Sequence, residues 1–315
     1  MNAMNKAQNL STHLQEHTRA RALLGTVVEI SATGTVERVH QAINQAFDVV
    51  AEIQALMSYQ DPASELSRIN QFAFDGPVAV HEHTWQVLSA AHEIAEASAG
   101  LFDITIAPRL TRLGFLPRHA HFPRASRHGN WHHIALLPGR RVQFMRHVCI
   151  DLSGIAKGYA VDRAIRTLQV AGMQAGRVNA GGDLRVFGAP PQAIHVRAPY
   201  KPTQMISLLQ IAAGAAATSA IYFSQRRRGQ QMVSPLIHPH TGDPCNRNRS
   251  VTVLAPNCLH ADALTKVVQA DPAQATQLLA RYQARAFIVE QDSGSSACRI
   301  FDSGHPAQLN HVSAV

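Results

Sequence analysis

The sequence predicts a mixed α+β fold. Segments rich in β-branched residues alternate with helical segments of unequal length, which differs from the regular alternation of a parallel β/α protein. Hydrophobic residues make up 46% of the 315 residues, enough for a sizeable core. No internal repeat or linker interrupts the chain. We therefore expect a single folded domain at residues 23–315, preceded by a flexible arm at residues 1–22.

The first half of the chain is predicted to be mainly helical. The segment 36–57 places apolar residues such as Val39, Ile43 and Phe47 on one stripe, the pattern of an amphipathic helix. Asp61 or Ser64 is expected to cap a short helix that follows. The remaining expected elements are a strand at 23–32, a helix at 83–100 that ends at Gly100, an exposed excursion at 116–130 and, after it, a hairpin at 131–145 that turns at Pro138-Gly139.

The second half is predicted to be richer in strands. A helix is expected to follow Asp151 and to end at Gly172. The other expected elements are a strand–glycine turn–strand unit at 176–188, strands at 193–199, 204–219 and 250–257, helices at 258–270 and 272–283, and a final strand at 285–291.

Composition excludes several classes of function. The 29 Lys and Arg residues outnumber the 21 Asp and Glu residues, which suits an anionic ligand. The densest basic run, residues 226–228, is interpreted as a solvated loop. Because the chain has no zinc-finger spacing, basic-zipper region or aromatic RNA-binding motif, we expect no nucleic-acid partner. No stretch approaches about 18 consecutive apolar residues, so membrane insertion is not expected.

Cysteine usage and the start of the chain bear on location. The four cysteines form no CxxC pair, which argues against a disulfide scaffold or a zinc site. The first 25 residues are polar and lack the apolar segment of a signal peptide. We therefore expect a cytoplasmic protein, or an exported one if the true start lies upstream.

The segment "IDLSGIAKGYAVD" at 150–162 is the first candidate site. Gly154 and Gly158 flank Lys157 where an apolar strand passes into a helix, so the backbone and an ammonium group can meet an anion. Asp162 lies one turn along the helix and can accept hydrogen bonds from a base or a ribose. A plain strand–turn–helix with a solvated lysine explains the segment about equally well.

Two further candidate segments each contain an aspartate, one beside paired glycines and the other among hydrophobic residues. In "NAGGD" at 179–183, Gly181 and Gly182 permit close contact with a ring or a phosphate, and Asp183 supplies a polar edge. A tight hairpin turn is the simpler explanation. Asp103 is embedded among apolar residues in 100–110, where a carboxylate has to be paired or functional. Helix capping by Asp103 is the alternative.

The last candidates are hydroxyl, imidazole and carboxylate groups in the second half. Thr218 and Ser219 follow a strand of small residues. His238 and its neighbour two residues on form a weak metal-binding signal because no third ligand accompanies them. Asp262 opens a helix with Thr265 one turn later, a pair of oxygen ligands suited to Mg²⁺. A first-turn aspartate stabilised by the helix dipole is the alternative.

The order of these segments carries a resemblance that none of them carries alone. Taken together, "MSYQDPASELSRIN", "GLFDITIAPRL", "IDLSGIAKGYAVD", "VNAGGD", "ATSAIY", "IHPHTGDP" and "SVTVLAPNCLHADALT" resemble the signature segments of the ApbE-type FAD:protein FMN transferase family. The similarity spans about residues 25–268. It implies a mixed α+β, two-lobed, T-fold-like architecture with FAD in the cleft between the lobes.

The resemblance also implies an activity and a set of site residues. Family members cleave the pyrophosphate of FAD beside Mg²⁺, attach FMN to a Thr or Ser hydroxyl of a target flavoprotein and release AMP. The cofactor-binding residues implied are Met57, Tyr59, Asn70, Asp103, Thr105, Lys157, Asp162, Gly181, Gly182, Asp183 and Thr218. The catalytic residues implied are Ser219, His238, Asp262, Thr265 and Lys266, and the metal ligands implied are Ala156, Asp262 and Thr265.

The sequence departs from the family pattern on the catalytic side. The family usually has Thr four residues after the metal-binding Asp, whereas here that position is Lys266 and Thr265 comes one residue early. Pro235 and His238 replace the usual His and Asp, and Ala220 follows Thr218-Ser219 where Gly is usual. Either Thr265 still reaches Mg²⁺, or the Lys266 ammonium takes the place of the cation. The alternative function is that of a catalytically impaired FAD-binding homologue acting as a flavin carrier or regulator.

Overall fold

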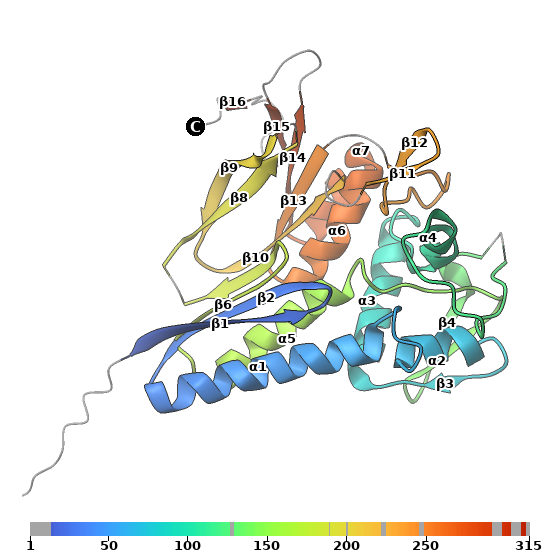
Figure 1. Cartoon of the computed structure of the whole chain (residues 1–315), viewed down its shortest axis with the longest axis horizontal. Helices are drawn as coiled ribbons and strands as arrows, with labels where there is room; N and C mark the ends of the chain where they lie inside the picture. Colours follow the sequence, from blue (N-terminus) through green and yellow to red (C-terminus); the bar gives the residue numbers. More distant parts are fainter. Residues whose placement is uncertain are drawn as a thin grey trace, which may run out of the picture.

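The computed structural model describes residues 14–126, 129–188, 190–199, 201–221, 225–245, 249–291, 298–303 and 310–312. A nine-stranded sheet, entirely antiparallel, runs through the molecule in the order β1-β2-β6-β7-β10-β13-β14-β15-β16 (Figure 1). Its strands are β1 (Gln15–Leu23), β2 (Thr26–Gly34), β6 (Ala175–Ala180), β7 (Asp183–Phe187), β10 (Gly214–Ala220), β13 (Arg249–Ala255), β14 (Arg285–Gln291), β15 (Cys298–Asp302) and β16 (Asn310–Val312). The predicted α+β class is confirmed.

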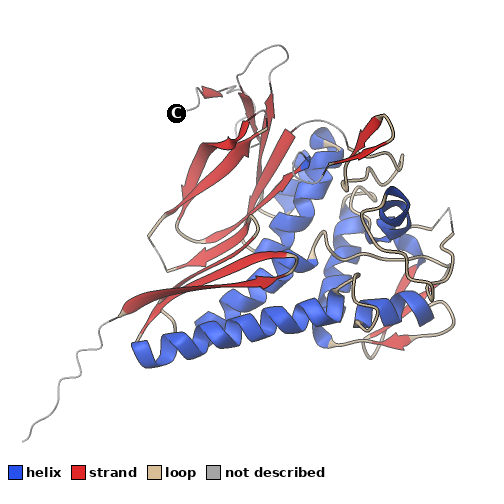
Figure 2. Cartoon of the chain, viewed as in Figure 1, coloured by secondary structure: helices blue, strands red, loops and turns tan. Residues whose placement is uncertain are grey.

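Helices cover one face of this sheet, as Figure 2 shows. They are α1 (Val36–Met57), α5 (Ala156–Val170) and α6 (Cys258–Ala270), and α7 (Pro272–Arg281) packs beside α6. Helix α1 begins and ends at the predicted residues. Its predicted stripe, including Val39, Ile43 and Phe47, is buried, so amphipathic periodicity placed the correct face on the core.

The segment between α1 and α5 folds into a smaller unit beside the main sheet. It contains α2 (Glu65–Phe72), α3 (Glu82–Ala97), α4 (Ala107–Leu113) and a small sheet in the order β3-β5-β4, with β3 at Val78–Ala79, β4 at Ile134–Leu137 and β5 at Arg141–Phe144. Ser64 caps α2 by accepting a hydrogen bond from the Ser67 amide, and the predicted 131–145 hairpin is present. One hydrophobic core joins this unit to the main sheet, and the expected division into two lobes stays a prediction.

A hairpin covers part of the opposite face of the sheet. Strands β8 (Gln192–Ala198) and β9 (Lys201–Ile211) pair with each other, and a second small hairpin pairs β11 (Arg226–Arg228) with β12 (Gln231–Val233). Val196 and Ile206 of the first hairpin pack with Val289 and Ile300 of β14 and β15 to form a small separate core. Both faces of the β14 region are therefore covered.

Two sequence predictions about the ends of the chain were wrong. Residues 15–22, expected within a flexible arm, belong to β1, which pairs along its whole length with β2 from Gln15–Gly34 to Leu23–Thr26. Most β1 side chains are exposed, so the strand is held by main-chain pairing. Its sequence therefore lacks the apolar alternation by which a strand can be predicted. The strand at 285–291 is also not the last, since β15 and β16 follow it. The rest of the expected arm, residues 1–13, lies outside the described residues.

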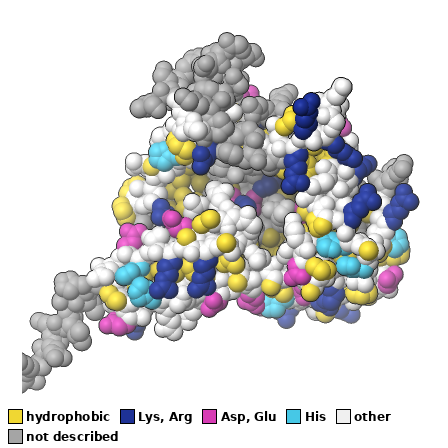
Figure 3. All heavy atoms as spheres, viewed as in Figure 1, with side chains coloured by type: hydrophobic (Ala, Val, Ile, Leu, Met, Phe, Trp, Pro, Cys, Tyr) yellow, Lys and Arg dark blue, Asp and Glu magenta, His cyan; other side chains and the backbone are white. Residues whose placement is uncertain are grey.

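Helix length and surface charge can both be described. Among the described helices, none combines the length and the apolar character that crossing a membrane requires. On the face drawn in Figure 3, Lys and Arg side chains are spread among other residues and do not form one continuous tract.

Candidate functional site

Two lysines and two aspartates from distant segments meet where α5, α6 and the β6–β7 turn come together. The Lys157 ammonium forms an ion pair with Asp183 and lies 4.0 Å from Oδ2 of Asp262. The Lys266 ammonium pairs with Oδ1 of Asp262 and donates a hydrogen bond of 3.0 Å to the main-chain oxygen of the same residue. The sequence placed all four residues in the site, and the structure brings them into one cluster, named here the lysine–aspartate cluster.

Close packing of two helices creates this cluster. A Cβ at Gly158 would lie 2.3 Å from the carbonyl oxygen of Cys258, so only glycine lets α5 approach α6 so closely. The Gly158 amide donates a 3.1 Å hydrogen bond to Oδ2 of Asp262. The glycine expected to approach a ligand therefore packs against the neighbouring helix and orients the Asp262 carboxylate.

Burial and charge perturb the cluster in opposite directions. Burial alone would raise the pKa of Asp262, but the ammonium groups of Lys157 and Lys266 outweigh it and hold that pKa below its ordinary value. Burial and the nearby Asp262 charge raise the pKa of Asp183 to about 7. Burial disfavours the charged form of Lys157, yet its two carboxylate neighbours raise its pKa above the ordinary value.

A small cavity of about 180 Å³ opens beside the cluster. Its lining includes Lys266 of α6 and, from the turn before α5, Asp151, Ser153 and Gly154. The Asp151 carboxylate accepts hydrogen bonds from the amide and the hydroxyl of Ser153 at 3.1 and 2.5 Å, and burial raises its pKa. The sequence analysis did not assign Asp151 to the site, although its position in an apolar run was an available signal.

A larger cavity of about 900 Å³ shares a wall with the small one. Asp103 lines both cavities, and its carboxylate accepts hydrogen bonds from the amide and hydroxyl of Thr105 and from the Trp131 amide. The large cavity is also lined by Tyr59 and by four basic residues that sequence reasoning missed. These four are Arg109, Arg112, Arg118 and Arg124. The arginines give the cavity a positive lining suited to an anionic ligand.

Asp162 has a different environment from the one that the sequence suggested. Its carboxylate accepts 2.8 Å hydrogen bonds from the amides of Cys258 and Leu259 and pairs with Arg185 at 2.6 Å. It therefore holds the start of α6 against α5, and these contacts occupy both of its oxygens. Arg185 was missed because only the fold brings β7 next to α5.

The glycine turn lies next to the cluster, as its sequence suggested. Gly181 and Gly182 adopt left-handed φ values of 60° and 102° between β6 and β7, and Asp183 follows directly. A Cβ at Gly182 would lie 3.9 Å from Thr218, which places β10 beside this turn. The main-chain oxygen of Ser219 accepts a hydrogen bond from Gln269 of α6.

The predicted flavin-contacting segment is largely internal. Met57 and Tyr59 are buried, and the Tyr59 hydroxyl lies 3.4 Å from that of Thr111. Burial raises the pKa of Tyr59 above its ordinary value. The Asn70 side chain exchanges two hydrogen bonds with the backbone of Ile150, at 2.8 and 2.9 Å. Asn70 therefore fixes the strand-like segment that leads to the cluster.

The remaining predicted residues are less directly placed. His238 lies in a turn at 238–244, where its ring accepts a 3.4 Å hydrogen bond from the Thr241 amide, and it lines neither of the two cavities. Thr265 is completely buried and its hydroxyl donates a 2.7 Å hydrogen bond to the main-chain oxygen of Asp262. Ala156 is buried at the first residue of α5.

Fold and site together define a class: an antiparallel α+β protein with a lysine–aspartate cluster beside a small cavity that adjoins a larger, basic one. The model of the ApbE family matches residues 24–288, and the chain belongs to this family. The resemblance read from the ordered motifs is thereby confirmed.

Similar proteins agree with that assignment. The chain is 29% identical to a Vibrio cholerae FAD:protein FMN transferase, over 69% of each chain. It is 26% identical to the Escherichia coli protein of the same name, over 78% of this chain and 75% of that one. The crystal structure of an ApbE protein from Thermotoga maritima has a TM-score of 0.76 at 28% identity, and covers 87% of this chain and 94% of its own.

Proposed function

We propose that the chain is an FAD:protein FMN transferase. It would cleave the pyrophosphate of FAD, join FMN through a phosphoester to a Thr or Ser hydroxyl of a target flavoprotein, and release AMP. The observation that carries the proposal is the lysine–aspartate cluster beside two adjoining cavities, in a chain of the ApbE family. The names of the similar proteins support the same reaction.

The charges of the site suit a diphosphate. Phosphoryl transfer depends mainly on positioning and on neutralising the charge that spreads over phosphate oxygens. Lys266 lines the small cavity, and Lys157, which is not part of that lining, pairs with Asp183. With the diphosphate beside Lys266, one end of FAD would extend past Asp103 into the arginine-lined cavity. This route keeps the expected cofactor-binding residues Asp103, Thr105 and Tyr59 along one path.

The expected Mg²⁺ ligands do not fit a divalent cation in this arrangement. Mg²⁺ requires several oxygen ligands in octahedral geometry. Here the Lys266 ammonium contacts both the carboxylate and the main-chain oxygen of Asp262, and the Thr265 hydroxyl is directed at that same main-chain oxygen. We therefore assign the cationic role to Lys266.

The alternative is that the chain binds FAD without transferring FMN and acts as a flavin carrier or regulator. The observation that favours it is the position of His238, which replaces the usual Asp and does not line either cavity. A carrier needs the basic cavity but not a residue that promotes bond cleavage.

One experiment separates the two functions. The purified protein is incubated with FAD and with a flavoprotein acceptor, once with Mg²⁺ and once with a chelator, and AMP is measured chromatographically. The transferase releases AMP and leaves a fluorescent flavin on the denatured acceptor in both conditions. Tight FAD binding without AMP identifies the carrier. Absence of FAD binding contradicts both functions.

A further inference from the structure

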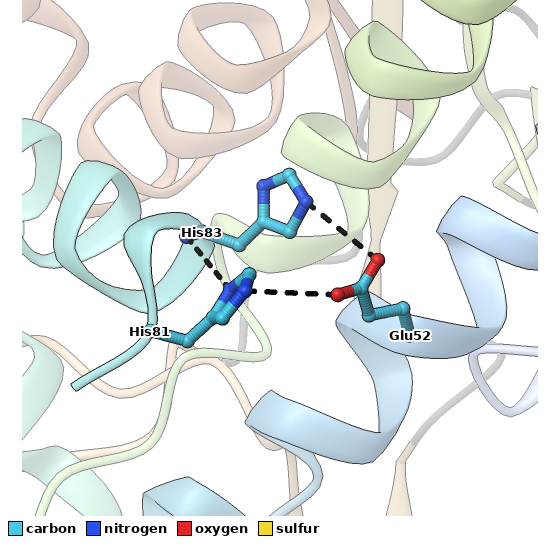
Figure 4. A group of neighbouring side chains, drawn as sticks. All are labelled: Glu52, His81 and His83. Atoms are coloured by element: carbon cyan, nitrogen blue, oxygen red, sulfur yellow. Dashed lines mark hydrogen bonds and ion pairs between the residues drawn. The ribbon is translucent and has the colours of Figure 1, made fainter.

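Three side chains outside the lysine–aspartate cluster converge at the surface between α1 and α3. Figure 4 shows Glu52 of α1 facing the imidazole rings of His81 and His83 at the start of α3. One ligand atom from each residue lies within 4.8 Å of the other two. The side chains of Glu52 and His81 are about half exposed, whereas that of His83 is 12% exposed.

A chain of hydrogen bonds fixes which nitrogen of His83 carries the proton. The Gln86 amide nitrogen donates to Glu82 at 3.0 Å, so the Gln86 amide oxygen faces Tyr159. The Tyr159 hydroxyl donates its only proton to that oxygen at 2.5 Å. His83 Nδ1 lies 2.7 Å from the Tyr159 oxygen and therefore has to be the donor.

The consequence is an unprotonated imidazole nitrogen that faces a carboxylate. In neutral His83, the usual form at pH 7, Nε2 then has no proton. Nε2 lies 3.9 Å from Oε2 of Glu52, and His81 Nε2 lies 3.7 Å from Oε1. Both distances exceed the range of a hydrogen bond. A zinc ion with bonds of about 2.1 Å holds two ligand atoms about 3.4 Å apart at a tetrahedral angle and about 4.2 Å apart when they are opposed.

We propose that Glu52, His81 and His83 form a binding site for a divalent transition-metal ion of the zinc class. Two imidazoles and one carboxylate favour such an ion over Mg²⁺, which prefers oxygen ligands. Tyr159 orients His83 in the manner of the outer partners that fix metal-bound imidazoles. The half-exposed ligands leave the remaining position open to water.

Metal binding changes the role of His81. Its Nδ1 accepts a 3.2 Å hydrogen bond from the His83 amide and so caps α3. When Nε2 binds the metal, the ring proton moves to Nδ1 and that capping bond is lost. The ion replaces it by joining α1 to the start of α3, and through His83 and Tyr159 it also reaches α5. The site therefore acts as a structural clamp, distinct from the lysine–aspartate cluster.

Isothermal titration calorimetry tests the site: zinc chloride is added to the metal-free full-length protein and the heat of binding is measured. The wild-type protein should bind one zinc ion. The Glu52→Gln and His81→Gln variants should bind zinc with an affinity at least about tenfold lower. Tyr159→Phe, which removes the acceptor for His83 Nδ1, should weaken binding by about tenfold or more. His195→Gln changes an exposed histidine on β8 in the same way and should bind zinc as the wild type does.

A second readout keeps the test independent of the fold of the variants. Without metal, Glu52→Gln should melt at the wild-type temperature, and added zinc should raise the melting temperature of the wild type more than that of the variant. Equal zinc affinity in the wild type and Glu52→Gln overturns the proposal, as does a wild-type protein that zinc does not stabilise.

Discussion

The Lys266 ammonium contacts Asp262 twice, through its carboxylate and, at 3.0 Å, through its main-chain oxygen. The ammonium group therefore contacts two oxygens of Asp262, one from the carboxylate and one from the main chain, that could otherwise be ligands of a metal ion. Lys266 is also the residue of this cluster that reaches the small cavity. The first prediction follows from this pair.

Replacing Lys266 with Thr should create a dependence on metal. The wild-type reaction is expected to tolerate a chelator, because the ammonium supplies the positive charge. Lys266→Thr removes that charge and adds an oxygen ligand beside Asp262, so AMP release should rise about tenfold or more with Mg²⁺. AMP is measured chromatographically across Mg²⁺ concentrations. Lys266→Gln is the control, since it removes the charge without adding a hydroxyl, and an identical metal profile in both variants contradicts the prediction.

The affinity for FAD should fall as pH rises through about 7. Burial and the Asp262 charge raise the pKa of Asp183 to about 7. Below that pH a neutral Asp183 leaves the cluster more positive, and above it an added negative charge repels the diphosphate. The dissociation constant should rise by at most about tenfold per pH unit.

Fluorescence titration from about pH 6 to about pH 8 measures this dependence. Asp183→Asn cannot ionise and should give a flatter profile. A wild-type affinity that does not vary with pH, or a variant profile with the same slope, argues against the role of Asp183.

Asp162 should matter first for stability. Its carboxylate accepts hydrogen bonds from the amides of Cys258 and Leu259 and pairs with Arg185. Asp162→Ala leaves these groups without a partner, and the free energy of unfolding should fall by about 3 kcal/mol. FAD affinity should fall with it, because the start of α6 positions Asp262. Urea denaturation checks the first effect, with Asp48→Asn as an exposed control. An unchanged midpoint would disprove the capping role.

Gly158→Ala should destabilise the protein through the helix crossing. The added methyl group would lie 2.3 Å from the Cys258 carbonyl oxygen, so α5 and α6 have to separate. Overpacking of this kind costs about 3 kcal/mol. Gly76→Ala adds a methyl group where no atom lies within 4 Å, and thermal denaturation of the two variants separates packing from a general effect of losing glycine. Equal melting temperatures would contradict the prediction.

Cys149 and Cys258 should resist alkylation in the folded protein. Burial raises the pKa of Cys149 to about 12 and that of Cys258 well above its ordinary value. Near pH 8 the thiolate share of Cys149 is therefore about one in ten thousand. Peptide mapping after iodoacetamide treatment should find both thiols unmodified until denaturant is added. Rapid labelling of either thiol under native conditions would show that it is not buried.

The sequence predicted best those features that depend on local patterns. The 36–57 helix was correct at both ends because its apolar stripe fills one face. The order of short motifs identified Lys157, Asp183 and Asp262 as members of one site. By contrast, β1 was missed because main-chain pairing with β2 holds a strand whose side chains are mostly exposed.

Roles that depend on tertiary contacts could not be predicted in the same way. Asp162 reads as a ligand-binding residue in its motif, and only the crossing of two helices reveals its contacts with Cys258 and Leu259. The arginines of the large cavity were also missed. Arg118 and Arg124 come from a segment without a recognisable motif, and Arg109 belongs to the 100–110 motif, but only the fold shows that it lines the cavity.

The contact at Gly158 also limits how the protein can respond to a substrate. The close approach of the two backbones and the hydrogen bond from the Gly158 amide to Asp262 both oppose a hinge motion between α5 and α6. The distance between the charged groups of residues 157 and 262 is then the same for every bound molecule. Accommodation of molecules of different size then falls to other parts of the lining, such as the 238–244 turn, which Arg109 of α4 holds by a hydrogen bond to Pro239.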